Sequence, residues 1–334
     1  MALNFDPEKV WYSNSVLSVM LLPLSWLFRV IVVLRRAYYR LGRRMRSTSS
    51  AFVIVVGNIT VGGTGKTPFL IWLAGQCCRR GLKTGIITRG YKGTHTTPVT
   101  EVGADSRVED VGDEALLLAR KTACPVVVGA DRGQALALLE QSIRPDVVLS
   151  DDGLQHYAMG RDFEIAVIDG EREFGNGRCL PARPLREPPS RLQSCDLVVR
   201  NGHGDPHSLY FEVEPEELLA LNLREGRKPL QEFSGRTVHA VAGVGNPRRF
   251  FRMLKRAGVD IIEHAFPDHH AYVKADLDFG DGAPILMTEK DAVKCETFLD
   301  SDIWYLPIIV QVNAALEQRI STLIEGIPIA KTTA

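Results

Sequence analysis

One stretch limits the fold of this chain more than any other. Val53–Pro68 reads VIVVGNITVGGTGKTP, an apolar run that passes into a glycine-rich loop and then into Lys-Thr-Pro. The β-branched run Val53–Val56 is typical of a parallel strand buried on both faces, and Pro68 suits the first turn of a helix. A glycine-rich loop between a strand and a helix presents backbone N–H groups and the positive helix end to phosphates. The stretch therefore predicts a P-loop, the triphosphate site of an α/β fold.

The loop also predicts individual roles. Lys66 would reach the β- and γ-phosphates of a nucleotide, and Thr67 would hold Mg²⁺. The usual pattern, G-x-x-x-x-G-K-[ST], has a glycine where this chain has Thr60. The alternative is an ordinary glycine-rich turn, but such a turn has no use for an adjacent Lys-Thr pair. The predicted nucleotide-binding residues are Thr60, Val61, Gly62, Gly63, Thr64, Gly65, Lys66 and Thr67.

Length and charge set wider limits. A chain of 334 residues fits two domains of ordinary size, and an apolar content of 45% supplies ample core. The formal net charge is zero, which argues against a protein that binds nucleic acid through bulk charge, and no segment indicates an obligate protein partner. The six cysteines form no C-x-x-C pair, so reduced thiols are expected and not a zinc site or disulfides.

The segment Val16–Leu34 is nearly apolar but contains Pro23 and Arg29. Arg near the middle of a membrane span would cost about 2.5 to 3.5 kcal/mol, so a transmembrane helix is disfavoured. Arginines crowd the sequence after Leu34, and no acidic residue occurs between Lys9 and Thr100. We expect a helix that lies in or dips into an anionic cytoplasmic leaflet. The alternative is a buried helix packed on the core.

A second strong motif follows about eighty residues after the P-loop. Asp146–His156 is a hydrophobic strand that ends in Asp151-Asp152 and continues as Gly-Leu-Gln155-His156. This form is typical of a Walker B element, whose carboxylates bind Mg²⁺ or order it. Gln155 and His156 lie in the same turn and could touch phosphate. Either Asp151 or Asp152 could be the direct ligand.

Other basic residues are candidates for anion contacts. Arg89 follows the predicted strand Thr84–Thr88, at the strand end where ligands bind in open α/β sheets. A long loop rich in Pro, Gly and Arg spans residues 174–189, and its arginines could grip an anionic substrate. These arginines are Arg178, Arg183 and Arg186.

Two further acidic and histidine motifs have ordinary explanations. Asp113 and Glu114 open a predicted helix, where acids are stabilised by the helix dipole. His269 lies in the loop Phe266–Tyr272, and loop histidines are commonly solvated or structural. Residue chemistry alone assigns a catalytic role to neither.

The chain divides into four predicted parts. Residues 201–235 turn polar and acidic, and a second α/β unit begins at Val238 with a strand, a Gly243-x-Gly245 turn and a helix. In this unit we expect one strand over Trp304–Val310. The parts are an N-terminal amphipathic helix over 1–48, a P-loop core over 49–205, a linker over 206–235 and a C-terminal α/β domain over 236–334.

The motifs together resemble the tetraacyldisaccharide 4′-kinases of lipid A biosynthesis. The matching segments extend over nearly the whole chain: Trp11–Asn14, Leu22–Ser25, Gly57–Thr67, Thr88–Tyr91, Gly112–Glu114, Asp151–His156, Leu185–Pro188 and Phe266–His269. The family shares the Ser or Thr at the position of Thr60. The resemblance implies a P-loop NTPase-like α/β/α core, a smaller α/β domain and a membrane-associated N-terminal helix.

The resemblance also implies an activity. The enzyme would use ATP and Mg²⁺ to phosphorylate the 4′-hydroxyl of an acylated disaccharide 1-phosphate, at the cytoplasmic face of the bacterial inner membrane. It implies that Asp113 and His269 act together on the hydroxyl proton, which reverses the two ordinary explanations given above. Lys66, Mg²⁺ and Arg89 would offset charge on the phosphoryl group.

A competing class is a P-loop switch or metal-insertion NTPase without a lipid substrate. That class predicts a guanine-specificity motif such as N-K-x-D, and Glu289-Lys-Asp291 lacks the Asn.

Overall fold

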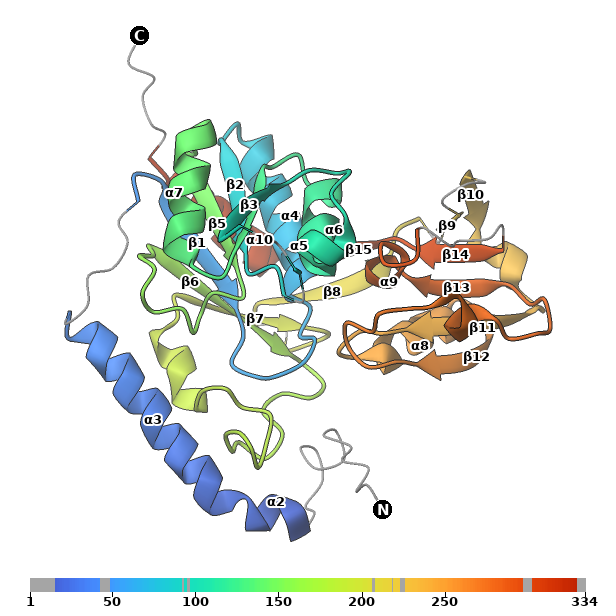
Figure 1. Ribbon diagram of the computed structural model, residues 1–334, viewed down its shortest axis with the longest axis horizontal. Helices are drawn as coiled ribbons and strands as arrows, with labels where there is room; N and C mark the ends of the chain where they lie inside the picture. Colours follow the sequence, from blue (N-terminus) through green and yellow to red (C-terminus); the bar gives the residue numbers. More distant parts are fainter. Residues whose placement is uncertain are drawn as a thin grey trace.

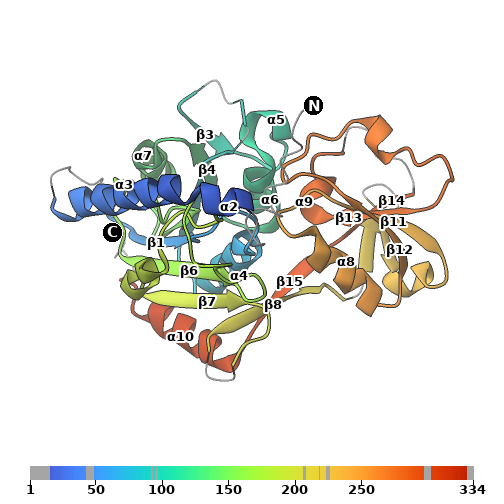
Figure 2. The ribbon, with the colours of Figure 1, turned by 90° about the horizontal axis from the view of Figure 1, so that it is seen from below.

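The computed structural model describes residues 16–42, 49–91, 93–94, 97–205, 208–217, 219–222, 226–296 and 302–328. Figures 1 and 2 show two sheets side by side, a larger one with helices on both faces and a smaller one beyond its edge. The predicted class, an α/β P-loop core with a second, smaller α/β domain, is confirmed.

The larger sheet has nine strands in the order β15-β8-β7-β6-β1-β5-β2-β4-β3. The seven inner strands run parallel, and the edge strands β15 and β3 pair antiparallel with their neighbours. The strands are β1 (Phe52–Gly57), β2 (Thr84–Thr88), β3 (Val99–Val102), β4 (Val126–Gly129), β5 (Val147–Asp151), β6 (Phe163–Asp169), β7 (Leu197–Asn201), β8 (Tyr210–Pro215) and β15 (Ile308–Val312).

The centre of this sheet is buried on both faces, as the β-branched runs predicted. Ile54 and Val56 pack into one hydrophobic core with α4, α6 and α10, whereas Val53 and Val55 pack into another with α7. Alternate residues of a strand point to opposite faces, so β1 contributes to both cores. The helices are α4 (Lys66–Arg79), α5 (Val108–Val111), α6 (Asp113–Lys121), α7 (Arg132–Ile143) and α10 (Ala314–Glu325).

The smaller sheet has six strands in the order β10-β9-β14-β13-β11-β12. Its core joins Phe250, Phe251 and Leu254 of α8 to Trp304. The elements are β9 (Leu219–Asn222), β10 (Gly226–Pro229), β11 (Thr237–Ala242), α8 (Pro247–Arg256), β12 (Asp260–Ala265), β13 (Ile285–Thr288), α9 (Glu289–Ala292) and β14 (Ile303–Leu306).

The prediction of one strand over Trp304–Val310 is wrong. The run forms two strands in different sheets, β14 in the smaller and β15 in the larger, with Pro307 between them. Proline has no N–H to donate to a ladder, so the apolar run breaks there.

The predicted domain boundaries also differ from the sheet membership. Strand β8 of the predicted linker belongs to the larger sheet, whereas β9 and β10 belong to the smaller one. In the predicted C-terminal domain, β15 and α10 return to the larger sheet, and Leu316, Ile320 and Ile324 complete its core. The chain therefore crosses between the two sheets twice.

The N-terminal helices α2 (Val16–Met20) and α3 (Leu22–Arg40) lie at the periphery of the larger domain (Figure 1). Their contacts with the larger domain include a 2.6 Å hydrogen bond from Ser25 Oγ to the Cys179 carbonyl and the packing of buried Tyr39 on the ring of Tyr157. Most of their large apolar side chains are exposed, so the alternative of a buried helix is wrong. In the part of the chain that is described, no helix is long and apolar enough to cross a membrane.

Candidate active site

The predicted P-loop follows β1 and ends at the first turn of α4. Gly62 and Gly65 have positive φ values of 101° and 86°, a conformation that favours glycine. A Cβ on Gly65 would lie 2.0 Å from Nδ2 of Asn201, which donates a hydrogen bond to the Thr64 carbonyl. The glycines of this loop are therefore required by conformation and by close packing.

The surroundings of Thr60 explain why this loop needs no glycine at that position of the usual pattern. It forms an isolated antiparallel bridge with Leu185, and the next N–H, of Val61, donates to the Pro184 carbonyl at 2.7 Å. Thr60 is not among the described residues with positive φ, so this position has no conformational need for glycine. Its side chain is buried instead.

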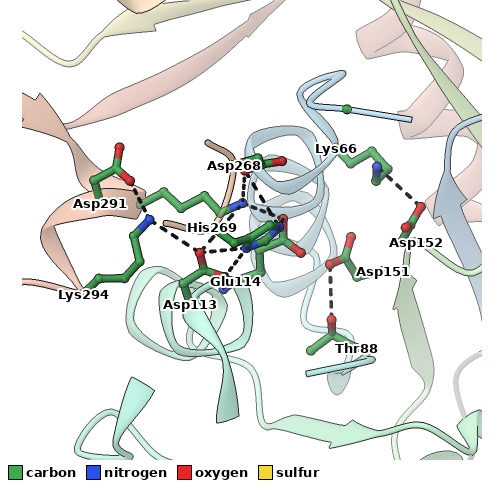
Figure 3. A network of polar contacts seen from close by, with 12 residues as sticks. Lys66, Thr88, Asp113, Glu114, Asp151, Asp152, Asp268, His269, Asp291 and Lys294 are labelled. Atoms are coloured by element: carbon green, nitrogen blue, oxygen red, sulfur yellow. Dashed lines mark hydrogen bonds and ion pairs between the residues drawn. The ribbon is translucent and has the colours of Figure 1, made fainter. Parts of the chain in front are cut away.

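The two aspartates at the end of β5 differ in their surroundings. Asp152 lies 3.4 Å from Lys66 Nζ and 2.8 Å from a guanidinium nitrogen of Arg186, and these charges outweigh its burial and lower its pKa. Asp151 is fully buried; Thr88 Oγ1 donates to its Oδ2 at 3.3 Å, and its Oδ1 has no hydrogen-bond partner (Figure 3). Burial, followed by the charges of Glu114 and Asp152, raises the pKa of Asp151.

Asp113 and His269 are brought together from the two domains. Asp113 is the first residue of α6, and His269 follows β12 in the smaller domain. The Nδ1 atom of His269 lies 2.9 Å from both carboxylate oxygens of Asp113 (Figure 3), and the ring of Tyr91 packs on the imidazole. His269 has a φ of 58°, an uncommon conformation for a residue with a side chain.

Several charges act on Asp113. Burial would raise its pKa, but the hydrogen bond with His269 and the charges of Lys290, His269 and Lys294 lower the pKa to about 2. Asp113 is therefore a carboxylate at neutral pH. The carboxylate–imidazole pair can orient an imidazole and stabilise it when it takes up a proton, which is the arrangement of a general base.

The sequence reasoning missed Lys290 and Lys294. Lys290 Nζ lies 2.9 Å from Glu114, 3.5 Å from Asp268 and 4.0 Å from Asp113. Lys294 Nζ lies 2.6 Å from Asp291 and 3.9 Å from Asp113. The T-E-K-D-x-x-K pattern over residues 288–294 was the only available signal, and no spacing rule links its Lys290 to Glu114, 176 positions earlier.

The remaining candidates lie around one cleft of about 1860 Å³ between the two domains. It is lined by the P-loop from Val61 to Thr67 and by further predicted residues: Arg89, Glu114, Asp151, Asp152, Gln155, His156, Arg186 and His269. Gln155 has a structural partner as well, because its Nε2 donates to the carbonyl of Asn58 at 2.9 Å. Arg183 is buried and is not among the cleft residues, so its predicted grip on substrate is not supported.

The cleft is closed on one side by the loop of the smaller domain that contains the Gly243-x-Gly245 turn. Gly245 packs against the P-loop backbone at Gly63, and its carbonyl accepts a 2.8 Å hydrogen bond from Arg172. Arg249 of α8 lies 3.3 Å from Asp169 at the end of β6. Both domains therefore contribute to one site.

A P-loop with carboxylates on the adjacent strand, facing a carboxylate–imidazole pair across an interdomain cleft, defines a class of protein: a P-loop phosphotransferase with a substrate domain. Comparison with known proteins specifies the family. A family model described as Tetraacyldisaccharide-1-P 4′-kinase matches residues 17–325. The chain therefore belongs to this family and is a kinase, as the motif resemblance implied.

Individual relatives agree with the family model. The tetraacyldisaccharide 4′-kinase of Methylobacillus flagellatus is 48% identical over 318 residues, 94% of each chain. That of Nitrosococcus oceani is 46% identical over 320 residues, 95% of this chain and 94% of the relative. The crystal structure of the "apo" form of LpxK from Aquifex aeolicus in complex with ATP matches with a TM-score of 0.75 at 28% identity, over 92% of this chain and 99% of that one.

Proposed function

We propose that this kinase transfers the γ-phosphate of ATP to the 4′-hydroxyl of a tetraacylated glucosamine disaccharide 1-phosphate, a step in lipid A biosynthesis. The observation that carries the proposal, beside family membership, is the 2.9 Å contact of His269 with Asp113 across the cleft from the P-loop. A nucleotide switch needs a phosphate site and a carboxylate for the metal. It has no use for a proton acceptor supplied by a second domain.

The donor half of the site would be the P-loop. Backbone N–H groups from Val61 to Thr67 would hold the phosphates of ATP, and Lys66 would neutralise charge on the transferred group. In this structure Lys66 is paired with Asp152, so ATP would exchange one anionic partner of the lysine for another.

Mg²⁺ fits Asp151 better than Asp152. Among the described residues, no group of three or more His, Cys, Asp or Glu side chains could hold a metal ion. Mg²⁺ in kinases needs fewer, because one or two protein ligands are completed by phosphates and water. Both residues have a buried Oδ1 without a hydrogen bond. The two oxygens of Asp152 form ion pairs with Lys66 and Arg186, whereas no ion pair of Asp151 occurs among the described residues. Asp151 and Thr67 would hold the ion, which would neutralise the phosphoryl oxygens.

The acceptor half would be the Asp113–His269 pair. The 4′-hydroxyl must lose a proton as its oxygen attacks phosphorus. With a pKa lowered to about 2, Asp113 does not retain a proton at neutral pH, so the proton comes to rest on the imidazole. Asp113 would then stabilise the imidazolium. Glu114 and Arg89, which also line the cleft, would orient the acceptor and the phosphoryl group.

The lipid would be reached from the cytoplasmic face of the inner membrane, through helices α2 and α3. Their exposed apolar side chains would enter the leaflet, and the arginines of α3 would face its anionic head groups. The exposed apolar residues are Val16, Leu17, Val19, Met20, Leu24, Trp26, Leu27, Val30, Ile31, Val33, Leu34, Tyr38 and Leu41.

The test is to incubate the enzyme with γ-labelled ATP, Mg²⁺ and the acylated disaccharide 1-phosphate. We expect label in a doubly phosphorylated lipid, and a 10²- to 10⁴-fold lower rate in Asp113→Ala and His269→Ala. Lys255→Ala, on an exposed ion pair of α8, is the control. Label released only as inorganic phosphate would favour the nucleotide switch instead. Near-normal turnover in folded Asp113→Ala would remove the base assignment.

A further inference from the structure

Two lysines of the smaller domain lie beside the proposed proton acceptor, the Asp113–His269 pair. Lys290, on α9, and Lys294, just after it, are both nearly buried, with side-chain exposures of 16% and 8%. Burial would lower the pKa of Lys290, but Glu114, Asp113 and Asp268 raise it, so the ammonium stays charged. Buried ammonium groups are costly unless they compensate carboxylates, and these two lie among four of them.

The carboxylates converge on His269. Besides the contact with Asp113, its Nε2 lies 3.8 Å from Asp268 and 4.0 Å from Glu114. Each carboxylate favours the imidazolium form, and an imidazolium cannot accept a proton. Among the described residues, Lys290 and Lys294 are the positive groups that pair with this cluster, and the titratable Tyr91 packs on the ring. The charge balance at His269 thus depends on the two lysines.

The lysines are held in place by the contact of α9 with α6. Glu289 lies 3.1 Å from Lys121, Glu296 pairs with Arg120, and Val293 belongs to the hydrophobic core of the larger domain. The smaller domain is therefore fixed to the helix that carries Asp113 and Glu114. Lys290 is at the centre of this contact.

We propose that Lys290 is a positioning residue for phosphoryl transfer, whose ammonium holds Glu114 and Asp268 and balances the negative charge around His269 until the substrate hydroxyl arrives. Lys294 supports the same state, because it links Asp113 to the fully buried Asp291. This inference rests on the proposed role of the Asp113–His269 pair. Lys290 transfers no proton and touches no reacting atom; it acts through the imidazole.

The experiment is the pH dependence of kcat, from about pH 5.5 to 9.5, in Lys290→Met. Loss of the ammonium favours imidazolium, so the acidic limb should move up by about one pH unit. The rate would fall about ten-fold on the acidic limb, below both midpoints, and less near neutral pH, and it would recover above pH 9. Lys290→Arg, which keeps the charge, should retain the wild-type midpoint.

The matched control is Lys121→Met, which removes a lysine from the same α6–α9 contact but pairs with Glu289 and Glu216 and not with the acceptor. It should change thermal stability without moving the midpoint. A second variant, Asp268→Asn, removes a carboxylate and should move the limb to lower pH. The double variant Lys290→Met/Asp268→Asn should return the midpoint close to wild type, and it answers the question even if Lys290→Met alone does not fold.

Three outcomes overturn the inference: a uniform loss at every pH in Lys290→Met, an unchanged profile, or a midpoint in Asp268→Asn that does not move down. Failure of the underlying function has a different signature. In that case His269→Gln would turn over at a near-normal rate, whatever Lys290 does. If His269→Gln is inactive and Lys290→Met has the wild-type profile, only the role of Lys290 is refuted.

Discussion

Gly245→Ala tests how closely the two domains must meet for catalysis. The added Cβ would lie 2.1 Å from the backbone N of Gly63 and 2.7 Å from its Cα, and real Cβ atoms essentially never come within 3.0 Å of another heavy atom. Both atoms belong to the backbone of Gly63, so rotation of a side chain cannot relieve the clash. The loop of the smaller domain must retreat from the P-loop by about 1 Å, a misplacement that can cost about 100-fold in rate.

The assay is steady-state transfer to the acylated disaccharide 1-phosphate, with thermal unfolding measured in parallel. We expect kcat/KM to fall about 100-fold, or about 2.7 kcal/mol in the activation barrier, while the unfolding temperature changes little. Gly75→Ala is the matched control because it lies inside α4, where a Cβ meets nothing within 4 Å, and it should stabilise the protein by about 1 kcal/mol at full activity. Wild-type kcat/KM in Gly245→Ala would show that the packing of this loop on the P-loop has no part in the reaction.

Three further predictions follow from the site and the N-terminal helices. Asp151→Asn should lower the rate of Mg²⁺-dependent transfer at least 100-fold, and added Mg²⁺ should not restore the rate. Full rescue by excess metal would indicate that Asp152, not Asp151, is the direct ligand. Asp113→Asn should be about 2 kcal/mol less stable than wild type near pH 7. Because the pKa of Asp113 is lowered from 3.8 to about 2, that difference should shrink as pH falls from 4 to 2, measured by denaturant unfolding; a constant difference would refute the charge argument. Replacement of exposed Trp26 and Leu27 by Ser should weaken sedimentation with anionic vesicles at least ten-fold, and unchanged binding would exclude this face of α3.

The donor half of the site was predictable because its residues are local to strand ends. Val53–Val56 and Val147–Asp151 are both buried runs followed by polar turns, and the carboxyl ends of parallel strands meet at one edge of a sheet. The structure pairs Val56 with Asp151 in adjacent strands, so the P-loop and the two aspartates are neighbours through the backbone alone. The sequence motifs and the positions of the strand ends therefore predict the same phosphate-binding site.

The acceptor half could not be predicted in this way. Asp113 and His269 are 156 positions apart, and each has an ordinary explanation in its own segment. Only the resemblance joined them. Lys290 and Lys294 had no signal beyond the T-E-K-D-x-x-K pattern, because a lysine on or just after a short helix is expected to be solvated until its burial against Glu114 and Asp113 is known. Long-range charge compensation leaves no period or spacing in a sequence.

The path of the chain between the two sheets explains how the Asp113–His269 pair can depend on contacts with lysines of the smaller domain. Both crossings between the sheets pass the same place: β8 ends at Pro215, β15 begins at Ile308, and these two residues pair in antiparallel register at the edge of the larger sheet. Lys121, at the end of α6, lies 4.0 Å from Glu216 beside this crossing. A rotation of the smaller domain that preserves the pairing must pivot there, so contacts near the pivot change little and distant ones change more. Asp113 lies at the other end of α6, about 12 Å away at 1.5 Å per residue. Under such a rotation the acceptor pair would therefore be displaced less than contacts farther from the pivot, as the proposed role of the α9 lysines at His269 requires.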